Sequence, residues 1–389
     1  MTSWDYSFVH RTKLFHGGLA LEQIPVELEQ KSAHNPLVVT RGNTPRSKIK
    51  TLVNAFSKFL NRINIYDRVP SVVEEESIHE IAGIYNETGA DSILALGDGS
   101  VIETCKAANI LVSKDGANLR DFQGRDTLSG TMRPLFAIPT HAQCGFSINK
   151  SLQVNSGNDS YFLVSPLLMP TAVVTDPRMM IAGSKQEIAK SILASLFKAM
   201  EAATGPDRNP TSKAFAHSCL DLLRNELNHS LEKIKDKDLQ ARIVNANVLS
   251  DMAISNTSQG LGYAISRTIT DRENIPGDIA TGLMLPEILK IRAKENDFRE
   301  MMARLLLPLA GPEVYASTPS SDRPRETIKK VESFIAYLQE AGEDTFKLQN
   351  LGPVSGPEDI ARAVIRNEQA LGDEIPTEHQ VMDILNSVP

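Results

Sequence analysis

Short buried runs of aliphatic and β-branched residues alternate with helical patterns over the first half of the chain. Each run ends at a glycine, a proline or an aspartate that stops a strand. Helical spacing of apolar positions fills the gaps at 78–86 and 101–111. Strands that alternate with helices predict a mostly parallel sheet. The four predicted strands are 37–40, 92–96, 135–138 and 172–175.

From about residue 184 the strand signal disappears and amphipathic helical patterns continue to the end of the chain. Ser184 followed by Glu187 predicts a capped helix start, and Ser355 with Glu358 repeats the pattern. The sequence therefore predicts an α/β domain over residues 1–180 and an all-helical domain over residues 181–389. The further predicted helices are 213–228, 238–252, 282–292, 325–341 and 358–371.

Composition narrows the class of protein. A length of 389 residues agrees with two domains. A net charge of -7 argues against a nucleic-acid partner, and no apolar run is long enough to predict a membrane span. The beginning of the chain lacks the pattern of a signal peptide, and three scattered cysteines predict neither a disulfide framework nor a thiolate zinc site. We therefore expect a cytoplasmic protein.

A glycine-rich turn follows the second predicted strand. Gly97, Asp98, Gly99 and Ser100 lie between that strand and a predicted helix. Glycines in such a turn let backbone N–H groups approach a phosphate, and the helix N-terminus adds partial positive charge. The alternative interpretation is a tight turn without a ligand, because the motif is shorter than a full G-x-G-x-x-G.

The sequence around this turn resembles a known family. Residues 91–106, DSILALGDGSVIETCK, resemble the D-x-I-I-A-L-G-G-G-S-V-I-D-T-A-K signature of the iron-containing alcohol dehydrogenases. Other segments resemble motifs of that family in the same order along the chain. These segments are 15–18 (FHGG), 138–145 (IPTHAQCG), 172–177 (AVVTDP), 199–202 (AMEA), 260–265 (GLGYAI) and 275–286.

The resemblance implies a fold, a cofactor and an assembly. It implies a Rossmann-like dinucleotide-binding domain followed by an all-α domain, the architecture shared with dehydroquinate synthase-like enzymes. The active site would lie in the cleft between the two domains. The resemblance also implies NAD or NADP as the cofactor and a homodimer as the assembly.

The metal site of the family is the point at which this chain departs from the resemblance. The family holds a divalent metal with one Asp and three His, and these positions align with Ala194, Lys198, Tyr263 and Gly277. A further cleft histidine of the family aligns with Arg267. Alanine and glycine side chains offer no donor atom, and an ammonium repels a dication. We therefore expect no metal ion at this position.

The cofactor side of the family is retained in part. Asp98 replaces a glycine, and its carboxylate disfavours a neighbouring pyrophosphate unless it points away. His141 replaces a smaller residue in the second cofactor loop. The retained residues that the resemblance assigns to the cofactor are Gly97, Gly99, Ser100, Lys106, Thr140 and Gly145.

Arg41 bears on the choice between the two cofactors. It follows the strand 37–40, where the family often has an acidic residue that binds the adenosine ribose. An arginine suits a 2′-phosphate, which favours NADP over NAD. The alternative is a solvated cation in a loop.

Lys198, Tyr263 and Arg267 are the candidate catalytic residues. A buried ammonium stabilises negative charge on a substrate oxygen, and a tyrosine can donate a proton to an alkoxide. Arg267 lies one helical turn after Tyr263 and could clamp an anionic substrate group. Structural alternatives exist for each: Lys198 could be solvated, Tyr263 could fill the space of a lost metal, and Arg267 could pair with Asp271.

Three functions follow from these residues. The first is a metal-independent NAD(P)-dependent oxidoreductase that interconverts a small, anionic aldehyde or ketone and its alcohol. The second is a repurposed enzyme of the same fold that catalyses a non-redox step. The third is a non-catalytic, ligand-binding descendant of the family.

Overall fold

The computed structural model describes most of the 389 residues in two compact units. One unit contains residues 9–182 and 235–248, and the other contains residues 1–8, 183–234 and 249–389. The residues that the structure describes are 5–56, 59, 63–115, 117–142, 148–156, 159–181, 183–205, 207–227, 233, 235–257, 260–273, 277–341, 356–371 and 376–387.

A six-stranded parallel sheet forms the centre of the first unit. Its strand order is β1-β9-β6-β4-β2-β3, and every neighbouring pair runs parallel. β4 lies inside the sheet, and all six of its residues are buried. The strands are β1 (Lys13–His16), β2 (Pro36–Val39), β3 (Asn64–Tyr66), β4 (Ser92–Gly97), β6 (Leu135–Pro139) and β9 (Ala172–Thr175).

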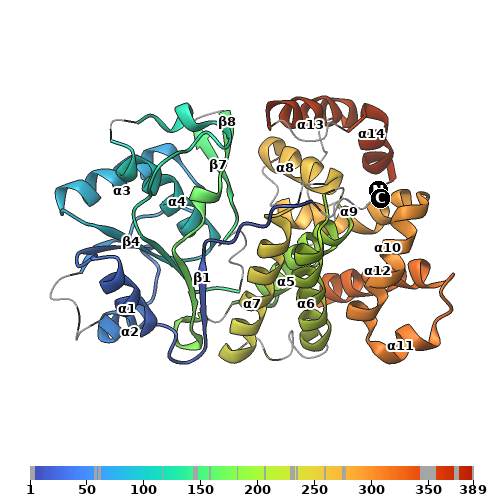
Figure 1. The fold of residues 1–389 in the computed structure, drawn as a ribbon, viewed down its shortest axis with the longest axis horizontal. Coiled ribbons are helices and arrows are strands. Elements are labelled where there is room, and N and C mark those ends of the chain that lie inside the picture. The colour runs from blue at the N-terminus through green and yellow to red at the C-terminus, as the bar shows by residue number, and fades with distance from the viewer. Residues whose placement is uncertain are drawn as a thin grey trace. The chain divides into compact units, whose positions relative to one another are not determined.

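Helices cover both faces of this sheet (Figure 1). Side chains of α1 (Gln23–Gln30) and α2 (Arg46–Phe56) share an apolar core with alternate residues of the central strands, among them Leu94 and Leu96. α3 (Glu75–Glu87) and α4 (Gly99–Ser113) pack on the other face. A sheet with helices on both faces places its ligand sites beyond the carboxyl ends of the strands.

A small second sheet lies in the same unit. Its order is β5-β8-β7, with β7 and β8 antiparallel and β5 parallel to β8. Its strands are β5 (Gly124–Arg125), β7 (Ser151–Ser156) and β8 (Asp159–Val164). Three 3₁₀ turns complete the unit, at η1 (Leu119–Phe122), η2 (Pro166–Leu168) and η3 (Pro177–Met179).

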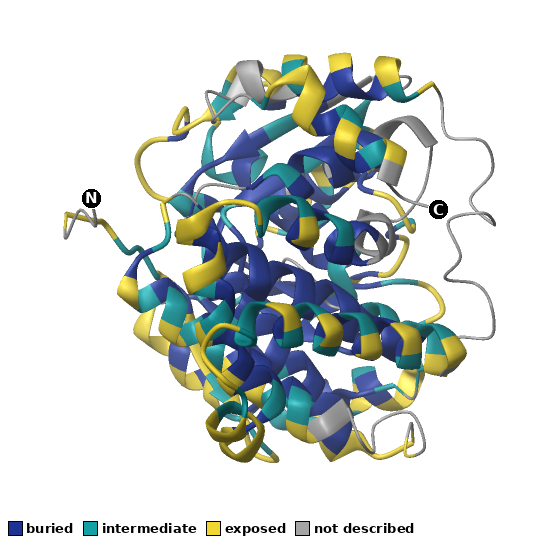
Figure 2. Cartoon of the chain, turned by 90° about the vertical axis from the view of Figure 1, so that its right-hand side faces the viewer, coloured by how far each residue is buried: buried dark blue, intermediate teal, exposed yellow. Residues whose placement is uncertain are grey.

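The described residues of the second unit form helices joined by loops, with no strand among them. α5 (Lys185–Thr204) is its most enclosed helix, since every residue from Ser191 to Thr204 is buried. Residues coloured as buried lie along the inner sides of these helices, and exposed residues lie along their outer sides (Figure 2). The helices that follow α5 in the chain are α6 (Pro210–Leu227), α7 (Lys237–Ile254, divided between the two units), α8 (Leu261–Glu273), α9 (Gly277–Arg292), α10 (Asn296–Ala310), α11 (Pro312–Ser317), α12 (Arg323–Ala341), α13 (Pro357–Leu371) and α14 (Glu378–Ser387).

The predicted architecture is confirmed. The four predicted strands correspond to β2, β4, β6 and β9, and an all-helical segment follows β9 within the described residues. The capping box of α5 is present: Glu187 N donates to Ser184 Oγ at 3.1 Å and Ser184 N donates to Glu187 Oε2 at 2.7 Å. Ser355, the second predicted cap, lies outside the described residues.

The division into units has one feature that the sequence did not suggest. Most of α7 belongs to the α/β unit: residues up to Val248 group with it, and residues from Leu249 onward group with the helical unit. Met180, Ala241 and Val244 form a small buried cluster that joins α7 to the end of the α/β chain segment. In the part of the chain that the structure describes, no helix is long and apolar enough to cross a membrane.

Candidate active site

The glycine turn lies at the carboxyl end of β4. Gly97 ends the strand and α4 begins at Gly99. A Cβ on Gly97 would stand 2.6 Å from Val101 Cγ2 and 2.7 Å from Val101 Cβ, so only glycine allows this close approach of strand and helix. The turn therefore presents the N-terminus of a 15-residue helix at the edge of the sheet where a phosphate is expected to bind.

Asp98 is the N-cap of α4. Its Oδ1 accepts hydrogen bonds from Ser100 Oγ at 2.8 Å and from Val101 N at 3.3 Å. Its Oδ2 lies 3.2 Å from Nη2 of Arg41, and both side chains are about three-quarters buried. The carboxylate thus turns toward its own helix and toward a cation. These contacts accommodate an acidic side chain in this turn.

Arg41 lies beside the glycine turn and is not a solvated loop cation. Besides Asp98, its Nη2 donates to Ser100 Oγ, and its Nε is buried without a hydrogen-bond partner. The guanidinium is therefore fixed beside the first turn of α4. A 2′-phosphate that reached this guanidinium would find a positioned donor fork.

The second cofactor loop begins beside the glycine turn. β6 pairs with β4 in the register Gly97 to Pro139, and Thr140 N donates to Gly97 O at 2.9 Å. Thr140 is fully buried, and its Oγ1 lies 2.9 Å from His141 Nδ1. Thr140 and His141 are thus brought to the same edge as the turn, whereas Gly145 lies outside the described residues.

Lys106 lies deeper in the unit. It follows Gly99 by seven residues, which is about 10 Å along the axis of α4. Its side chain is 1% exposed, and Nζ donates to the carbonyl of Asn149 at 3.0 Å. This bond ties α4 to the segment before β7, and contact of Lys106 with the cofactor stays a prediction.

Lys198 lies on α5 in the interior of the helical unit. The side chain is 3% exposed, and Nζ donates to Asp251 Oδ1 on α7 at 2.6 Å; the Asp251 side chain is 1% exposed. The alternative of a solvated lysine is therefore wrong, because α5 is enclosed on all sides. Burial of an ammonium is costly unless it is paired, and Asp251 supplies that pair.

The surroundings of this ion pair do not fit the divalent metal of the family. Ala194, one turn before Lys198, offers no donor atom, and the ammonium itself is bonded to Asp251. Cys219 of α6 lies nearby, and burial raises the pKa of its thiol to about 12, which keeps the sulfur protonated. Across the described residues, no group of three His, Cys, Asp or Glu side chains could hold a metal ion.

Tyr263 and Arg267 both belong to α8, four positions apart. Their side chains lie outside the described residues, as does everything at 274–276. Gly277, which aligns with a metal ligand of the family, is the first residue of α9.

Glu201 is a buried acid that the sequence analysis did not single out. It lies one turn after Lys198 and is 2% exposed, and its Oε2 has no hydrogen-bond partner. Burial raises the pKa of this carboxyl, while Arg292 and the N–H of Gly262 oppose the shift. Gly260 makes room for it, because a Cβ there would stand 1.9 Å from Glu201 Oε2.

Asp251 was also missed, although the sequence carried a signal for it. Asn247, Ser250 and Asp251 form a polar group within an otherwise apolar helical pattern, and all three are buried. Its partner lies 53 positions earlier in the chain, so the pairing itself could not be derived from local spacing.

Both halves of the chain match models of one protein family. Residues 11–177 match the model of the iron-containing alcohol dehydrogenases, and residues 188–387 match the model of the C-terminal part of the Fe-containing alcohol dehydrogenase family. Alcohol dehydrogenase 4 of Schizosaccharomyces pombe is 23% identical over 69% of this chain and 68% of that protein. Sulfoacetaldehyde reductase of Bilophila wadsworthia is 23% identical over 72% of this chain and 73% of that protein.

Solved structures share the fold. A 1,3-propanediol oxidoreductase superposes with a TM-score of 0.88 at 17% identity, over 99% of this chain and 100% of that chain. The sulfoacetaldehyde reductase of Bifidobacterium kashiwanohense in complex with NAD+ superposes with a TM-score of 0.80 at 16% identity, over 99% of this chain and 98% of that chain.

Proposed function

Because the chain belongs to the iron-containing alcohol dehydrogenase family, we propose that it is an NAD(P)-dependent oxidoreductase that works without a bound metal ion. Its substrate would be a small aldehyde or ketone with an anionic group, or the corresponding alcohol. The observation that carries this proposal is the buried pair of Lys198 and Asp251, because the motif resemblance aligns Lys198 with a metal ligand of the family.

Lys198 would stabilise charge on the substrate oxygen in place of the metal. An ammonium has three N–H donors, so a lysine can bond to Asp251 and to a substrate oxygen at the same time. In a buried site such a donor stabilises the negative charge that develops on the oxygen. Asp251 would act as a positioning residue, since its carboxylate holds the ammonium in one place.

The α/β unit would hold the cofactor, which supplies or accepts the hydride when bound. The N–H groups of Gly99 and Ser100 at the start of α4 would bind its pyrophosphate. Arg41 beside Ser100 would bind a 2′-phosphate, which makes NADP the preferred cofactor. Thr140 and His141 would border the same site.

An anionic substrate would suit the cations of the helical unit. Arg267 on α8 is the proposed clamp for the anionic group, and Tyr263 one turn earlier is a proposed proton donor. Two relatives described above are named as reductases of sulfoacetaldehyde, a small aldehyde with a sulfonate group. These names support the size and charge of the proposed substrate class.

A ligand-binding protein without catalysis is the second candidate function. It is favoured by Asp98, whose carboxylate already occupies the N-cap of α4 and places negative charge where a pyrophosphate would bind. In that case the Lys198–Asp251 pair would only fill the interior of the bundle.

The two functions differ in cofactor binding and turnover. We expect calorimetry to detect NADPH binding, and we expect NADPH oxidation with short aldehydes and keto acids in the presence of a chelator. A Lys198→Met variant should bind NADPH with unchanged affinity and lose turnover. Absence of binding of both NADPH and NADH at millimolar concentration would reject the oxidoreductase in favour of the second candidate.

A further inference from the structure

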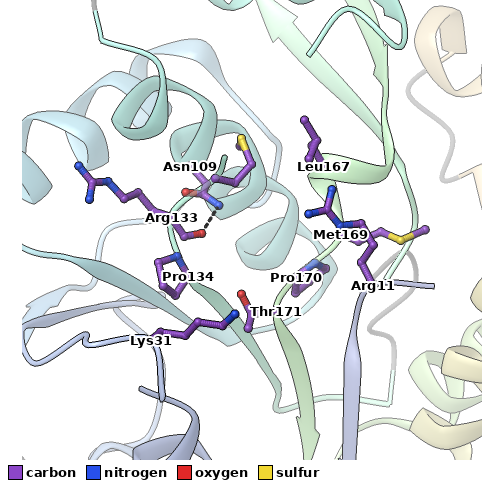
Figure 3. Close-up of a pocket in the computed structure, with 10 residues that line it drawn as sticks. Arg11, Lys31, Asn109, Arg133, Pro134, Leu167, Met169, Pro170 and Thr171 are labelled. Carbon is purple, nitrogen blue, oxygen red and sulfur yellow. Dashed lines mark hydrogen bonds between the residues drawn. The ribbon is translucent and has the colours of Figure 1, made fainter. Parts of the chain in front are cut away.

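A pocket lies at the opposite edge of the main sheet from the glycine turn (Figure 3). Its volume is about 170 Å³, and all of its lining residues belong to the α/β unit. Pro134 precedes β6 and Thr171 precedes β9, so the pocket borders the amino ends of strands whose carboxyl ends face the cofactor turn. It is therefore a separate feature from the candidate active site.

All charged residues that line this pocket are cationic. Arg11, Lys31 and Arg133 contribute to it, and no acidic residue does. Among the residues that the structure describes, none of these three side chains has an ion pair or a side-chain hydrogen bond. Arg11 and Lys31 are exposed to solvent, so both cations can be reached by an anion from outside the protein.

Two of the cations are directed at the pocket. In Figure 3 the ammonium of Lys31 reaches toward Thr171, and the guanidinium of Arg11 extends toward Leu167 from the other side. The side chain of Arg133 extends away from both, so its contribution to the lining is mainly backbone. Arg11 and Lys31 approach from separate segments, before β1 and after α1 respectively.

Two polar residues of the lining, Thr171 and Asn109, are held by hydrogen bonds within the protein. The hydroxyl oxygen of Thr171 accepts from Leu135 N at 3.2 Å, which leaves its O–H proton to be donated to a ligand. The Asn109 amide donates to Arg133 O at 3.0 Å, and its oxygen accepts from Ser113 Oγ at 3.1 Å. These bonds hold the Thr171 and Asn109 side chains in place before any ligand arrives.

We propose that this pocket binds a small doubly charged oxyanion, either inorganic phosphate or the phosphate group of a monoester. Two unpaired cations and one hydroxyl donor match the charge and the acceptor oxygens of a phosphate. The pocket volume is several times the ~30 Å³ that a water molecule occupies, so a tetrahedral oxyanion fits. The proposal is independent of the function proposed for the glycine turn.

Titration calorimetry of the full chain with inorganic phosphate, at constant ionic strength set with chloride, tests the site. We expect saturable binding by the unmodified protein and at least a tenfold loss of affinity in Arg11→Gln/Lys31→Met. Lys50→Met is the matched control, because Lys50 is an exposed lysine of the same unit outside the pocket. A parallel titration with glycerol phosphate distinguishes the two sources of the phosphate. A site for free phosphate should not bind glycerol phosphate, whereas a site for a monoester should bind it. Either result agrees with the proposal.

A further control separates this pocket from the cofactor turn, which could also bind phosphate. Arg41→Gln should leave the phosphate affinity of the pocket unchanged. Equal phosphate binding by the unmodified protein and by the double variant would overturn the proposal, as would no binding at 50 mM. Circular dichroism verifies that the double variant is folded. If it is not folded, the single Lys31→Met variant replaces it, and we expect that variant to lose phosphate affinity several-fold.

Discussion

Nζ of Lys198 and Oδ1 of Asp251 are 2.6 Å apart, and both side chains are almost completely buried. Such a pair contributes little net stability, since desolvation of the two charges offsets their attraction, but removal of one partner leaves an unpaired charge inside the bundle. Asp251→Ala should therefore lower the free energy of unfolding by about 3–5 kcal/mol. Urea unfolding followed by circular dichroism measures this change.

A double variant separates pairing from packing. Lys198→Met/Asp251→Leu removes both charges and should be clearly more stable than Asp251→Ala, because no unpaired charge remains. If the double variant lost as much stability as the sum of the two single changes, Lys198 and Asp251 would not be coupled.

Turnover, as well as stability, should depend on Lys198. If the ammonium stabilises the substrate oxygen, Lys198→Met should lower kcat by about 10²–10³, the usual effect of removing one such donor. A Lys198→Arg variant keeps the positive charge and should retain more activity than the methionine variant. Steady-state kinetics with NADPH measures both, and equal kcat values for all three proteins would remove Lys198 from the reaction.

Gly97 controls the geometry of the cofactor turn. A methyl group at this position would overlap the Val101 side chain, so Gly97→Ala should cost about 1–3 kcal/mol and weaken NADPH binding. Gly97→Ala/Val101→Ala should recover part of both losses. Gly83→Ala is the control: Gly83 is exposed in α3 with nothing within 4 Å of its added Cβ, so this change should stabilise the protein by up to about 1 kcal/mol. Thermal unfolding and NADPH titration give the two readouts.

Glu201 gives the helical unit a specific pH dependence. Burial raises the pKa of its carboxyl above the ordinary value of 4.5, so the folded state keeps a proton that the unfolded state releases first. This contribution to stability is complete below pH 4.5 and decreases as the pH rises toward the folded-state pKa. Glu201→Gln should remove that part of the pH dependence, measured by urea unfolding from pH 4 to pH 8. An unchanged slope would assign the dependence to other groups.

Arg41 and Asp98 should act in opposite directions on cofactor affinity. Arg41→Gln removes the cation beside Ser100 and leaves the Asp98 carboxylate without its ion pair, so NADPH affinity should fall at least tenfold more than NADH affinity. Asp98→Asn keeps a side chain that can cap α4 and removes negative charge, so it should tighten the binding of both cofactors. Calorimetric titrations with the two cofactors test this pair of changes.

The sequence predicted the elements that local pattern determines. The strand 92–96 corresponds to β4 because five consecutive apolar or small residues followed by a glycine have few other stable solutions in an α/β chain. β7 was missed because Gln153 and Asn155 interrupt its apolar pattern, as expected for a strand buried on one face only.

The site was predictable only in part, because its contacts join distant segments. The turn at Gly97 carries its own signature, but the direction of the Asp98 carboxylate depends on Arg41, 57 positions earlier. Likewise, the polar positions on α5 suggested a solvated arc, and only the packing of the bundle around that helix encloses Lys198. Burial and long-range pairing are tertiary properties that periodicity alone does not contain.

The metal content of the purified protein, measured together with its turnover, is the most direct test of the account. Elemental analysis after exhaustive dialysis against a chelator should find far less than one transition-metal ion per chain, with NADPH oxidation unchanged by the dialysis or by added Fe²⁺ or Zn²⁺. One tightly held ion per chain, whose removal abolishes turnover and whose return restores it, would contradict the claim that Lys198 stands in for the metal.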